Sequence, residues 1–434
     1  LEVVVDCHYS SSERGVQVAG GLDTLDGAKL MMIAAERKAS KIGVNMDIAI
    51  VDDGGNLLCF HRMDGAKITS IDVAAALATP GIVAIFTGAD WVAGGLGQHS
   101  AALGGRSRRD GSPAFCPIRH AIESDVVKVT GDIVAMVGAE SVNQAKDAAE
   151  HIVVDYDRLP VITDGLDARV DRAPALHAEC PDNESYFYTA GDKEAVEAAI
   201  AGAHHVTRLN TRINRITANT MEPRGCIGDY DHRLDRYTIY GANQLPYLIR
   251  KSLATDVLGV PETAIKIVTP NIGGSFGMKT MIYPEQPLVL FAARDLNRPV
   301  KWVSDRTEAF VSDNQGRDQV NHAELALDAD ARFTGVRVRS IGNFGAYYSS
   351  FGMYIPTVAG AGLLSGVYTI PAIHVEVKGV FTHTVSTDAY RGAGRPEAVY
   401  VIERLVAAAA RQLKINPIDL RRRNFIPKAA MPYT

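Results

Sequence analysis

Short β-strand patterns alternate with helical patterns through most of the chain, and this alternation limits the possible folds more than any other feature. In the last half, strand patterns occur at DRYTIYGAN, AIKIVTP, RPVKWVSD, HAELALD, FTGVRVRSIGNFGAY and HVEVKGVFT. Helices are expected to begin near Leu245, near Pro284 and at Pro396, where proline suits the first helical position. The pattern predicts a mixed α/β or α+β protein. With 434 residues, it has room for roughly three domains.

The first part of the chain divides into an irregular lead-in and a small α/β unit. Residues 1–23 show no convincing period, so we expect no regular structure there. Residues 24–67 predict an amphipathic helix that ends at Gly43, then two strands, MDIAIV and NLLCFHR. The turn Asp52-Asp53-Gly54-Gly55 is expected to join these strands as a hairpin.

A second α/β domain is predicted for residues 68–175. It contains a buried strand in PGIVAIFTGAD, a loop over 93–113, a strand pair in KVTGDIVAMVGAE, a helix capped by Ser141 and an edge strand in VVDYDRLPVITD. Residues 176–205 are expected to be a linker, because their first part is rich in proline and has no period. The last domain then spans 206–434.

Charge and cysteine content exclude several classes of function. The formal net charge is -5, and basic residues concentrate only at 106–109 and 421–423, so a nucleic-acid-binding face is not expected. The five cysteines are scattered without a two-residue spacing, which argues against an iron–sulfur cluster on this chain and against a disulfide framework. No apolar run reaches the length of a membrane span. We therefore expect a soluble protein of the reducing cytoplasm.

A glycine-rich segment follows one of the predicted strands. It reads Asn271-Ile-Gly-Gly-Ser-Phe-Gly-Met-Lys279 and comes directly after AIKIVTP. Glycines in this place let backbone amides approach a phosphate or a cofactor, since no Cβ intervenes. The spacing matches neither a Walker loop nor a dinucleotide-binding fingerprint. A purely structural turn is the more common use of such a segment.

Two further clusters combine polar side chains with glycines. Ala389-Tyr-Arg-Gly-Ala-Gly-Arg-Pro-Glu397 opens a predicted helix and offers arginine donors and free amides to an anion, unless its arginines simply pair with surface carboxylates. Gln244, in GANQLP, follows the strand DRYTIY and can present its amide to a ligand or merely cap the next helix.

Together these motifs resemble a known family. MEPRG, ANQLP, NIGGSFGMK, RPVKW, GNFGAY, AYRGAGRPEAVYVIER and DLRRRNFIP follow the order seen in the molybdenum-binding large subunits of the xanthine oxidase, aldehyde oxidase and aerobic carbon monoxide dehydrogenase family. The preceding IDVAAALATPGIVAIFTGADW is similar to that family's α/β hammerhead domain. The resemblance implies a hammerhead followed by the first half of the molybdopterin-binding domain.

The resemblance also implies roles for individual residues. Gln244 would hydrogen-bond an oxygen or sulfur ligand of molybdenum, and Arg391 would orient the substrate. The amides of the glycine-rich segment and of the residues after Arg391 would hold the pterin, while no side chain would bind the metal directly. Aromatic residues would wall the substrate pocket, although stacked aromatic rings are more often plain core. The implied cofactor residues are Gln244, Gly273, Gly274, Ser275, Phe276, Gly277, Arg391, Gly392 and Ala393, and the implied pocket residues are Phe344, Tyr347 and Tyr390.

Departures from the family pattern narrow the implied chemistry. Gly392 stands where carbon monoxide dehydrogenases carry a copper-binding cysteine, and Thr280 stands where xanthine-oxidising members carry an acid. The resemblance thus implies a form II-like protein that hydroxylates an aldehyde or an N-heteroaromatic carbon. The cofactor is expected to be molybdopterin cytosine dinucleotide. Electrons would leave through partner subunits that carry [2Fe-2S] clusters and FAD.

The family's catalytic glutamate lies in a second half that the resemblance does not reach. We therefore expect that glutamate on a partner chain, and expect this chain to be inactive alone; the other interpretation is a truncated, inactive product. Glu222, Glu285 and Glu397 are expected to be structural.

Residues 24–64 resemble the start of the GlcG/HbpS-like family of haem- or cobalamin-associated proteins. The non-enzymatic alternative is accordingly a haem-binding sensor, with His61 as a weak candidate ligand. We further hypothesise that NLLCFHR replaces the first hammerhead strand and pairs with residues 81–87.

Overall fold

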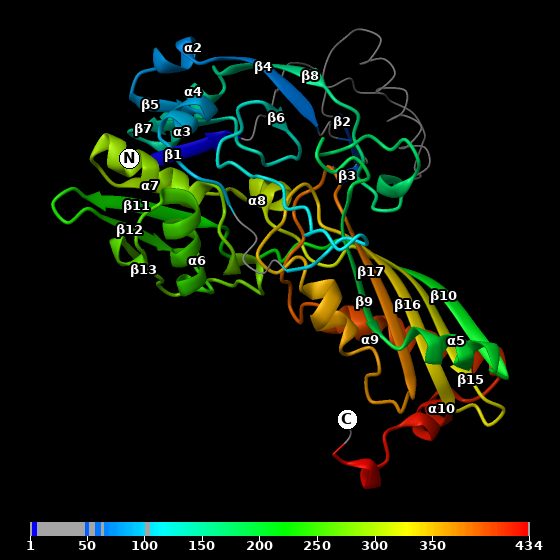
Figure 1. The fold of residues 1–434 in the computed structure, drawn as a ribbon. Helices are drawn as coiled ribbons and strands as arrows, with labels where there is room; N and C mark the ends of the chain where they lie inside the picture. Colours follow the sequence, from blue (N-terminus) through cyan, green and yellow to red (C-terminus); the bar gives the residue numbers. More distant parts are fainter. Residues whose placement is uncertain (1, 7–47, 52–56, 62–64, 100–104, 433–434) are drawn as a thin grey trace.

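The computed structural model describes residues 2–6, 48–51, 57–61, 65–99 and 105–432. These residues form the mixed α+β fold that the sequence predicts, with sheets of seven, five, three and two strands (Figure 1). The helix expected before Gly43 and most of the lead-in lie outside the described residues.

The elements before residue 205 belong mainly to the small N-terminal units. Their bounds are β1 Glu2–Asp6, β2 Ile48–Val51, β3 Leu57–His61, β4 Ala66–Asp72, α2 Ala74–Leu77, β5 Ile82–Thr87, α3 Gly88–Ala93, β6 Val126–Val127, β7 Ala135–Ala139, α4 Val142–Ala149, β8 Val153–Arg158, η1 Asp167–Arg169, β9 Glu184–Gly191 and α5 Lys193–Ala201.

The later elements build the region that holds the three polar motifs. They are β10 His205–Ile213, β11 Gly225–Asp231, β12 Arg236–Gly241, α6 Pro246–Ser252, η2 Leu253–Leu258, η3 Glu262–Ala264, β13 Ile265–Val268, η4 Met278–Thr280, α7 Glu285–Leu296, β14 Val300–Val303, α8 Arg306–Ser312, β15 Gln319–Leu327, β16 Phe333–Asn343, η5 Ile355–Ala359, β17 Ala372–Val380, α9 Arg395–Leu413, α10 Pro417–Asn424 and η6 Lys428–Ala430.

The seven-stranded sheet joins the two larger units and has the order β13-β12-β11-β14-β1-β7-β5. Strand β1 lies in its middle, parallel to β14 and antiparallel to β7. The prediction of an irregular start is therefore wrong for residues 2–6. The run of three valines favours a strand, but its partners are distant in sequence, so the short local pattern does not reveal it.

The strand pair predicted from MDIAIV and NLLCFHR is confirmed, because β2 and β3 pair antiparallel, while the turn expected at residues 52–55 lies outside the described residues. The hypothesis that NLLCFHR pairs with residues 81–87 is wrong. Strand β5 pairs with β7 at one end of the seven-stranded sheet, and β3 pairs with its neighbour β2 instead. Pairing across a short connection closes a small loop, which costs less conformational entropy than a distant partner.

The hammerhead region matches its predicted helix and edge strand but differs in two strands. Ser141 caps α4 by accepting a hydrogen bond from the Gln144 amide, and β8 is an edge strand of the sheet β6-β4-β8. The expected strand pair of KVTGDIVAMVGAE is wrong, since this segment contains one strand, β7, and the preceding β6 belongs to a different sheet. Asp132 accepts hydrogen bonds from the backbone N–H groups of Lys128 and Val129 and so shapes the turn between β6 and β7. Strand β5, predicted to be buried, is mostly half-buried because it lies at a sheet edge.

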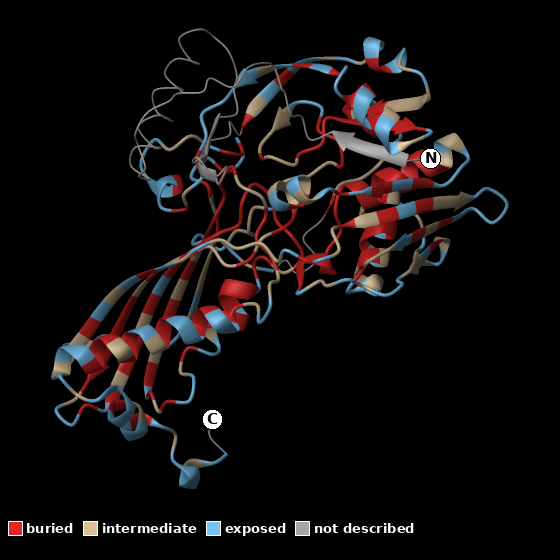
Figure 2. Ribbon diagram, turned by 180° about the vertical axis from the view of Figure 1, so that it is seen from behind, coloured by how far each residue is buried: buried red, intermediate tan, exposed pale blue. Residues whose placement is uncertain are grey.

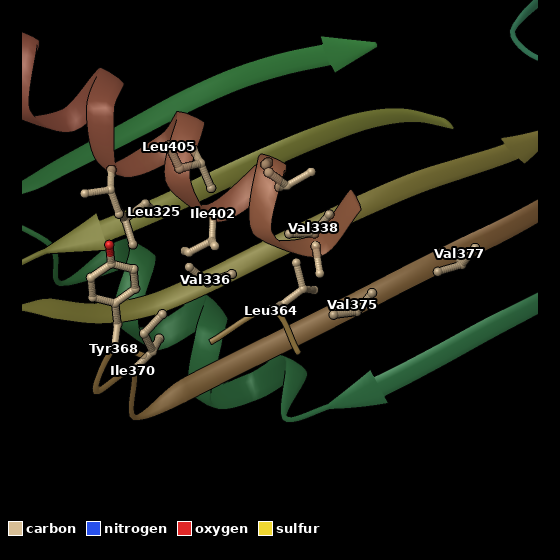
Figure 3. Close-up of a cluster of buried hydrophobic side chains, with 14 of the residues drawn as sticks. Leu325, Val336, Val338, Leu364, Tyr368, Ile370, Val375, Val377, Ile402 and Leu405 are labelled. Carbon is tan, nitrogen blue, oxygen red and sulfur yellow. The ribbon is translucent and has the colours of Figure 1, made fainter. Parts of the chain in front are cut away.

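The five-stranded sheet, β10-β15-β16-β17-β9, extends away from the other sheets and carries the largest core (Figures 1 and 2). Helix α9 packs against this sheet, with Ile402 and Leu405 facing Val336 and Val338 (Figure 3). The strands and helices predicted from this part of the sequence are confirmed. Residues 184–201, expected to be linker, instead form β9 and α5, because β9 pairs with β17 almost 190 residues later.

Candidate functional site

The glycine-rich segment, which we call the glycine loop (residues 271–279), connects β13 to the buried turn η4. Its backbone has a positive φ at Gly274 (103°), Phe276 (52°) and Gly277 (106°). A Cβ on Gly277 would lie 2.4 Å from the Ala389 carbonyl oxygen. Glycine at 277 is therefore required both by backbone conformation and by the close approach of a second chain segment.

Gln244 is fixed against this loop by its backbone and its side chain. Its N–H donates to the Lys279 carbonyl at 2.8 Å, and its Oε1 accepts from the Gly277 N–H at 3.1 Å and from the Ser275 hydroxyl. An N–H can only donate, so the amide oxygen must face the loop and the NH₂ group must face away from it. Leu245, not Gln244, is the N-cap of α6, so the helix-capping interpretation of Gln244 does not apply.

Glu222 and Lys279 clamp the start of the glycine loop. The Glu222 N–H donates to the Gly273 carbonyl at 3.1 Å, and the Gly273 N–H donates to Glu222 Oε2 at 2.9 Å. The buried Lys279 ammonium donates to Glu222 Oε2 and to its carbonyl oxygen, both at 2.8 Å. Partial burial favours a raised pKa for Glu222, but the bonds from Lys279 and Gly273 outweigh it and lower that pKa. The sequence predicts a structural role for Glu222, and the sequence motif by itself indicates no role for Lys279.

Backbone N–H groups of the loop remain available for a ligand. Within the described part of the chain, the amides of Gly274, Ser275 and Phe276 have no hydrogen-bond acceptor. Adjacent free amides on a backbone with positive φ form a concave anion-binding nest. Together with the outward NH₂ of Gln244, these donors suit the oxygen- and sulfur-rich groups of a pterin cofactor.

The second motif, which we call the arginine loop (residues 389–395), lies against the glycine loop. The Arg391 N–H donates to the Phe276 carbonyl at 2.9 Å. Gly392, Ala393 and Gly394 all have positive φ, of 95°, 39° and 91°. The Arg391 side chain is exposed and forms no ion pair with any described carboxylate, so the surface ion-pair interpretation does not apply to it. The two motifs, more than a hundred residues apart in sequence, thus form one site.

A buried ionic cluster lies in the protein interior next to the glycine loop. The Arg224 guanidinium contacts Glu285 and donates from Nε to Asp313 Oδ1 at 2.6 Å; all three side chains are at most 7% exposed. Burial raises the pKa values of Glu285 and Asp313, and the Arg224 charge opposes that effect. A small pocket between this cluster and the glycine loop is lined by Arg224, Glu285, Asn243 and Lys279.

The predicted pocket aromatics do not line the exposed face of the two loops. Phe344 and Tyr347 are 2% and 1% exposed and lie in the core. The Tyr347 hydroxyl donates to Glu123 at 3.1 Å and lies 3.3 Å from Asp132, in the hammerhead region. Tyr390 is half-buried and lies under the Arg317 guanidinium. The plain-core interpretation therefore fits Phe344 and Tyr347 because their rings fill internal space.

Apolar side chains of the glycine loop and of the segments next to Glu222 and Gln244 are exposed. Phe276, Tyr247 and Met221 are 46%, 77% and 91% exposed. Exposed apolar groups near a binding loop are typical of a surface that another polypeptide segment covers.

Among the described residues, no group of three or more His, Cys, Asp or Glu side chains is placed to hold a metal ion. None of the described helices has the length and apolar character needed to cross a lipid bilayer.

Comparison with known families identifies the chain as a molybdopterin-binding protein. Residues 176–425 match the molybdopterin cofactor-binding domain, and residues 62–160 match the aldehyde oxidase and xanthine dehydrogenase a/b hammerhead domain. The chain belongs to the family of molybdenum-binding large subunits that includes xanthine dehydrogenases and carbon monoxide dehydrogenases.

Individual relatives place the chain within this family. The large subunit of nicotine 6-hydroxylase from Paenarthrobacter nicotinovorans is 32% identical over 86% of this chain and 45% of that protein. The carbon monoxide dehydrogenase large chain of Hydrogenophaga pseudoflava is 33% identical over 85% and 46%. The solved structure of reconstituted CO dehydrogenase from Oligotropha carboxidovorans superposes with a TM-score of 0.78 at 29% identity, over 86% of this chain and 46% of that one. The chain thus spans about half the length of these curated relatives.

Proposed function

We propose that the chain supplies part of the cofactor and substrate site of a molybdenum hydroxylase that oxidises an aldehyde or an N-heteroaromatic compound. The observation that carries this proposal is the arrangement of Gln244. Its amide oxygen is held by the glycine loop, so its NH₂ group faces outward beside the free amides of that loop. A neutral donor in this position binds an oxygen or sulfur ligand without adding charge.

Each loop has its own part in the proposed site. The amides of Gly274, Ser275 and Phe276 bind the cofactor. The guanidinium of Arg391, which pairs with none of the described carboxylates, orients the substrate and offsets negative charge that develops on it. When bound, the molybdenum cofactor supplies two-electron oxidation and hydroxylation with oxygen from water. We propose the cytosine dinucleotide form of the cofactor, [2Fe-2S] and FAD on partner subunits, and a cytoplasmic location.

Oxidation of carbon monoxide is not part of the proposal, although a carbon monoxide dehydrogenase is among the relatives. Gly392 has no sulfur to bind copper. It also has φ of 95°, and a Cβ there would lie 2.6 Å from Pro396 Cγ. A cysteine at this position would be strained in the present loop.

We further propose that residues outside this chain complete the site and supply the catalytic glutamate. The support is the exposure of apolar side chains on and beside the glycine loop, since Phe276, Tyr247 and Met221 are 46%, 77% and 91% exposed. The residues that complete the site would cover the cofactor and exclude water from the reaction.

The test is co-production of the chain with the polypeptides encoded beside it, followed by molybdenum analysis, pterin fluorescence and dye-linked oxidation of aldehydes and N-heteroaromatics. We expect molybdenum in the complex and turnover that needs Arg391. Arg391→Ala should abolish most turnover, while Arg404→Ala, a matched exposed arginine on α9, should not. A haem Soret band without molybdenum would instead favour the sensor alternative.

A further inference from the structure

Arg317, just before β15, holds the arginine loop from inside the protein. Its Nη2 donates to the Arg391 carbonyl at 2.8 Å, and its Nη1 lies 3.2 Å from the Tyr390 carbonyl and 2.9 Å from Glu397 Oε1. The guanidinium is 10% exposed and lies 4.9 Å from the centre of the Tyr390 ring. One side chain therefore fixes two successive carbonyls of the loop and the first turn of α9.

These contacts decide where the next amide points. In a trans peptide the N–H and the C=O lie on opposite sides. Because the Arg391 carbonyl points to Arg317, the Gly392 N–H points away from Arg317. That N–H has no acceptor among the described residues. Arg317 thus sets the direction of a free donor that lies beside the glycine loop.

The backbone at Arg317 has an unusual conformation that supports a functional interpretation. Arg317 and Asp318 both have positive φ, of 70° and 63°, which residues with a Cβ rarely adopt in succession. Asp318 is kept in place by Arg215 at 2.9 Å and by the Asn343 side chain at 3.0 Å. Such conformations persist only where surrounding contacts fix them, and they concentrate at functional sites.

The Arg317–Glu397 pair also connects the loop to helix α9. Glu397 Oε2 accepts the Gly394 N–H at 2.9 Å, while Oε1 accepts from Arg317. Glu397 is 3% exposed, so both of its oxygens are satisfied inside the protein. The loop is therefore held at its carbonyls by Arg317 and at its end by Glu397.

We propose that Arg317 is a positioning residue for the molybdenum cofactor. It contacts neither the cofactor nor the substrate, and it acts by aiming the Gly392 amide and fixing the Arg391 backbone. This inference rests on the proposed function, since it assigns the Gly392 amide to the same cofactor.

The experiment compares Arg317→Met, Arg317→Lys and a matched control, Arg337→Met, in the full chain with its completing polypeptides. Arg337 is a similarly buried arginine, 15% exposed and paired with Glu324 on the five-stranded sheet. Two readouts are measured: molybdenum per folded chain, and hydrogen–deuterium exchange of residues 389–395 in the chain without cofactor. The Ala393 and Gly394 amides are hydrogen-bonded there, so their exchange reports loop order.

We expect Arg317→Met to lower molybdenum content about tenfold or more, as for other residues that support a metal site from outside. Exchange in residues 389–395 should rise at the same time, whereas Arg337→Met should change neither readout. Arg317→Lys should recover part of both, because an ammonium can bind one or two of the three acceptors.

Two results would overturn the inference. One is wild-type molybdenum content and loop exchange in Arg317→Met, and the other is an equal fall in molybdenum and rise in exchange in Arg337→Met. Absence of molybdenum from the wild-type complex would contradict the proposed function instead. In that case the exchange of residues 389–395 still decides whether Arg317 orders the loop.

Discussion

The glycine and arginine loops differ from the five-stranded sheet in how their backbone polar groups are used. In the sheet, β15, β16 and β17 pair in long registers, and their apolar side chains are buried under α9. In the loops, left-handed backbone leaves several amides without an acceptor among the described residues, and side chains such as Phe276 and Arg391 are exposed. The sheet supplies stability, while the loops keep binding capacity for a ligand, as expected when functional loops are carried by a rigid scaffold.

The largest expected effect comes from the ionic cluster beneath the loops. Arg224→Met leaves Glu285 and Asp313 buried without a cation, so the free energy of unfolding should fall by about 3–5 kcal/mol at neutral pH. Part of the loss should return as pH falls and the carboxylates become protonated. Denaturant unfolding at neutral and at lower pH measures both the loss of stability and its partial return. The control is Arg208→Met on the sheet; its partner Glu324 keeps Arg337, so a loss of similar size there would remove the contrast.

A core truncation beside the sheet should affect stability without affecting the site. Leu405 is fully buried on α9, so Leu405→Ala should lower the free energy of unfolding by about 2–5 kcal/mol. Molybdenum per folded chain should stay at the wild-type level. Equal loss of molybdenum and stability would show that sheet and loops are not separable.

The carboxyl group just before the arginine loop should make stability depend on pH. Burial raises the pKa of Asp388 to about 6, against hydrogen bonds from Ser349 and the Phe351 amide. The folded state then holds more protons than the unfolded state between about pH 4 and 6, so stability should fall as pH rises through this range. In Asp388→Asn, the fall in the free energy of unfolding between pH 4 and 6 should be smaller by about 2–3 kcal/mol. Unfolding curves from pH 4 to 7 measure it, and the exposed Asp419→Asn should leave the wild-type slope unchanged.

The smallest effect expected in this set distinguishes two glycines of the same loop. Gly277→Ala combines positive φ with a clash at the Ala389 carbonyl and should cost about 1–3 kcal/mol. In Gly274→Ala the new methyl group meets its nearest neighbour at 3.4 Å, so only backbone strain of about 1 kcal/mol is expected. Thermal unfolding of both variants checks the order. The reverse order would contradict the contact between the two loops.

Local pattern was enough to predict most of the regular elements of the last domain, although β10, β11, α8 and α10 were not predicted. Proline at the start of α9 and the apolar runs of β15 to β17 carry their own signals. The motifs also indicated both loops, since glycines after strands are visible in sequence. Contacts between distant segments carried no such signal. The Lys279–Glu222 clamp, the Arg317–Arg391 contact and the β9–β17 pair join residues that are 57, 74 and almost 190 positions apart.

Strand β1 has a consequence for solubility and folding. It fills the space between β7, in the hammerhead region, and β14, in the molybdopterin-binding region. Without those five residues, each neighbouring strand would present a row of unsatisfied N–H and C=O groups, which is a template for joining another molecule edge to edge. Shortening the chain by this one strand would therefore promote self-association through two newly open edges.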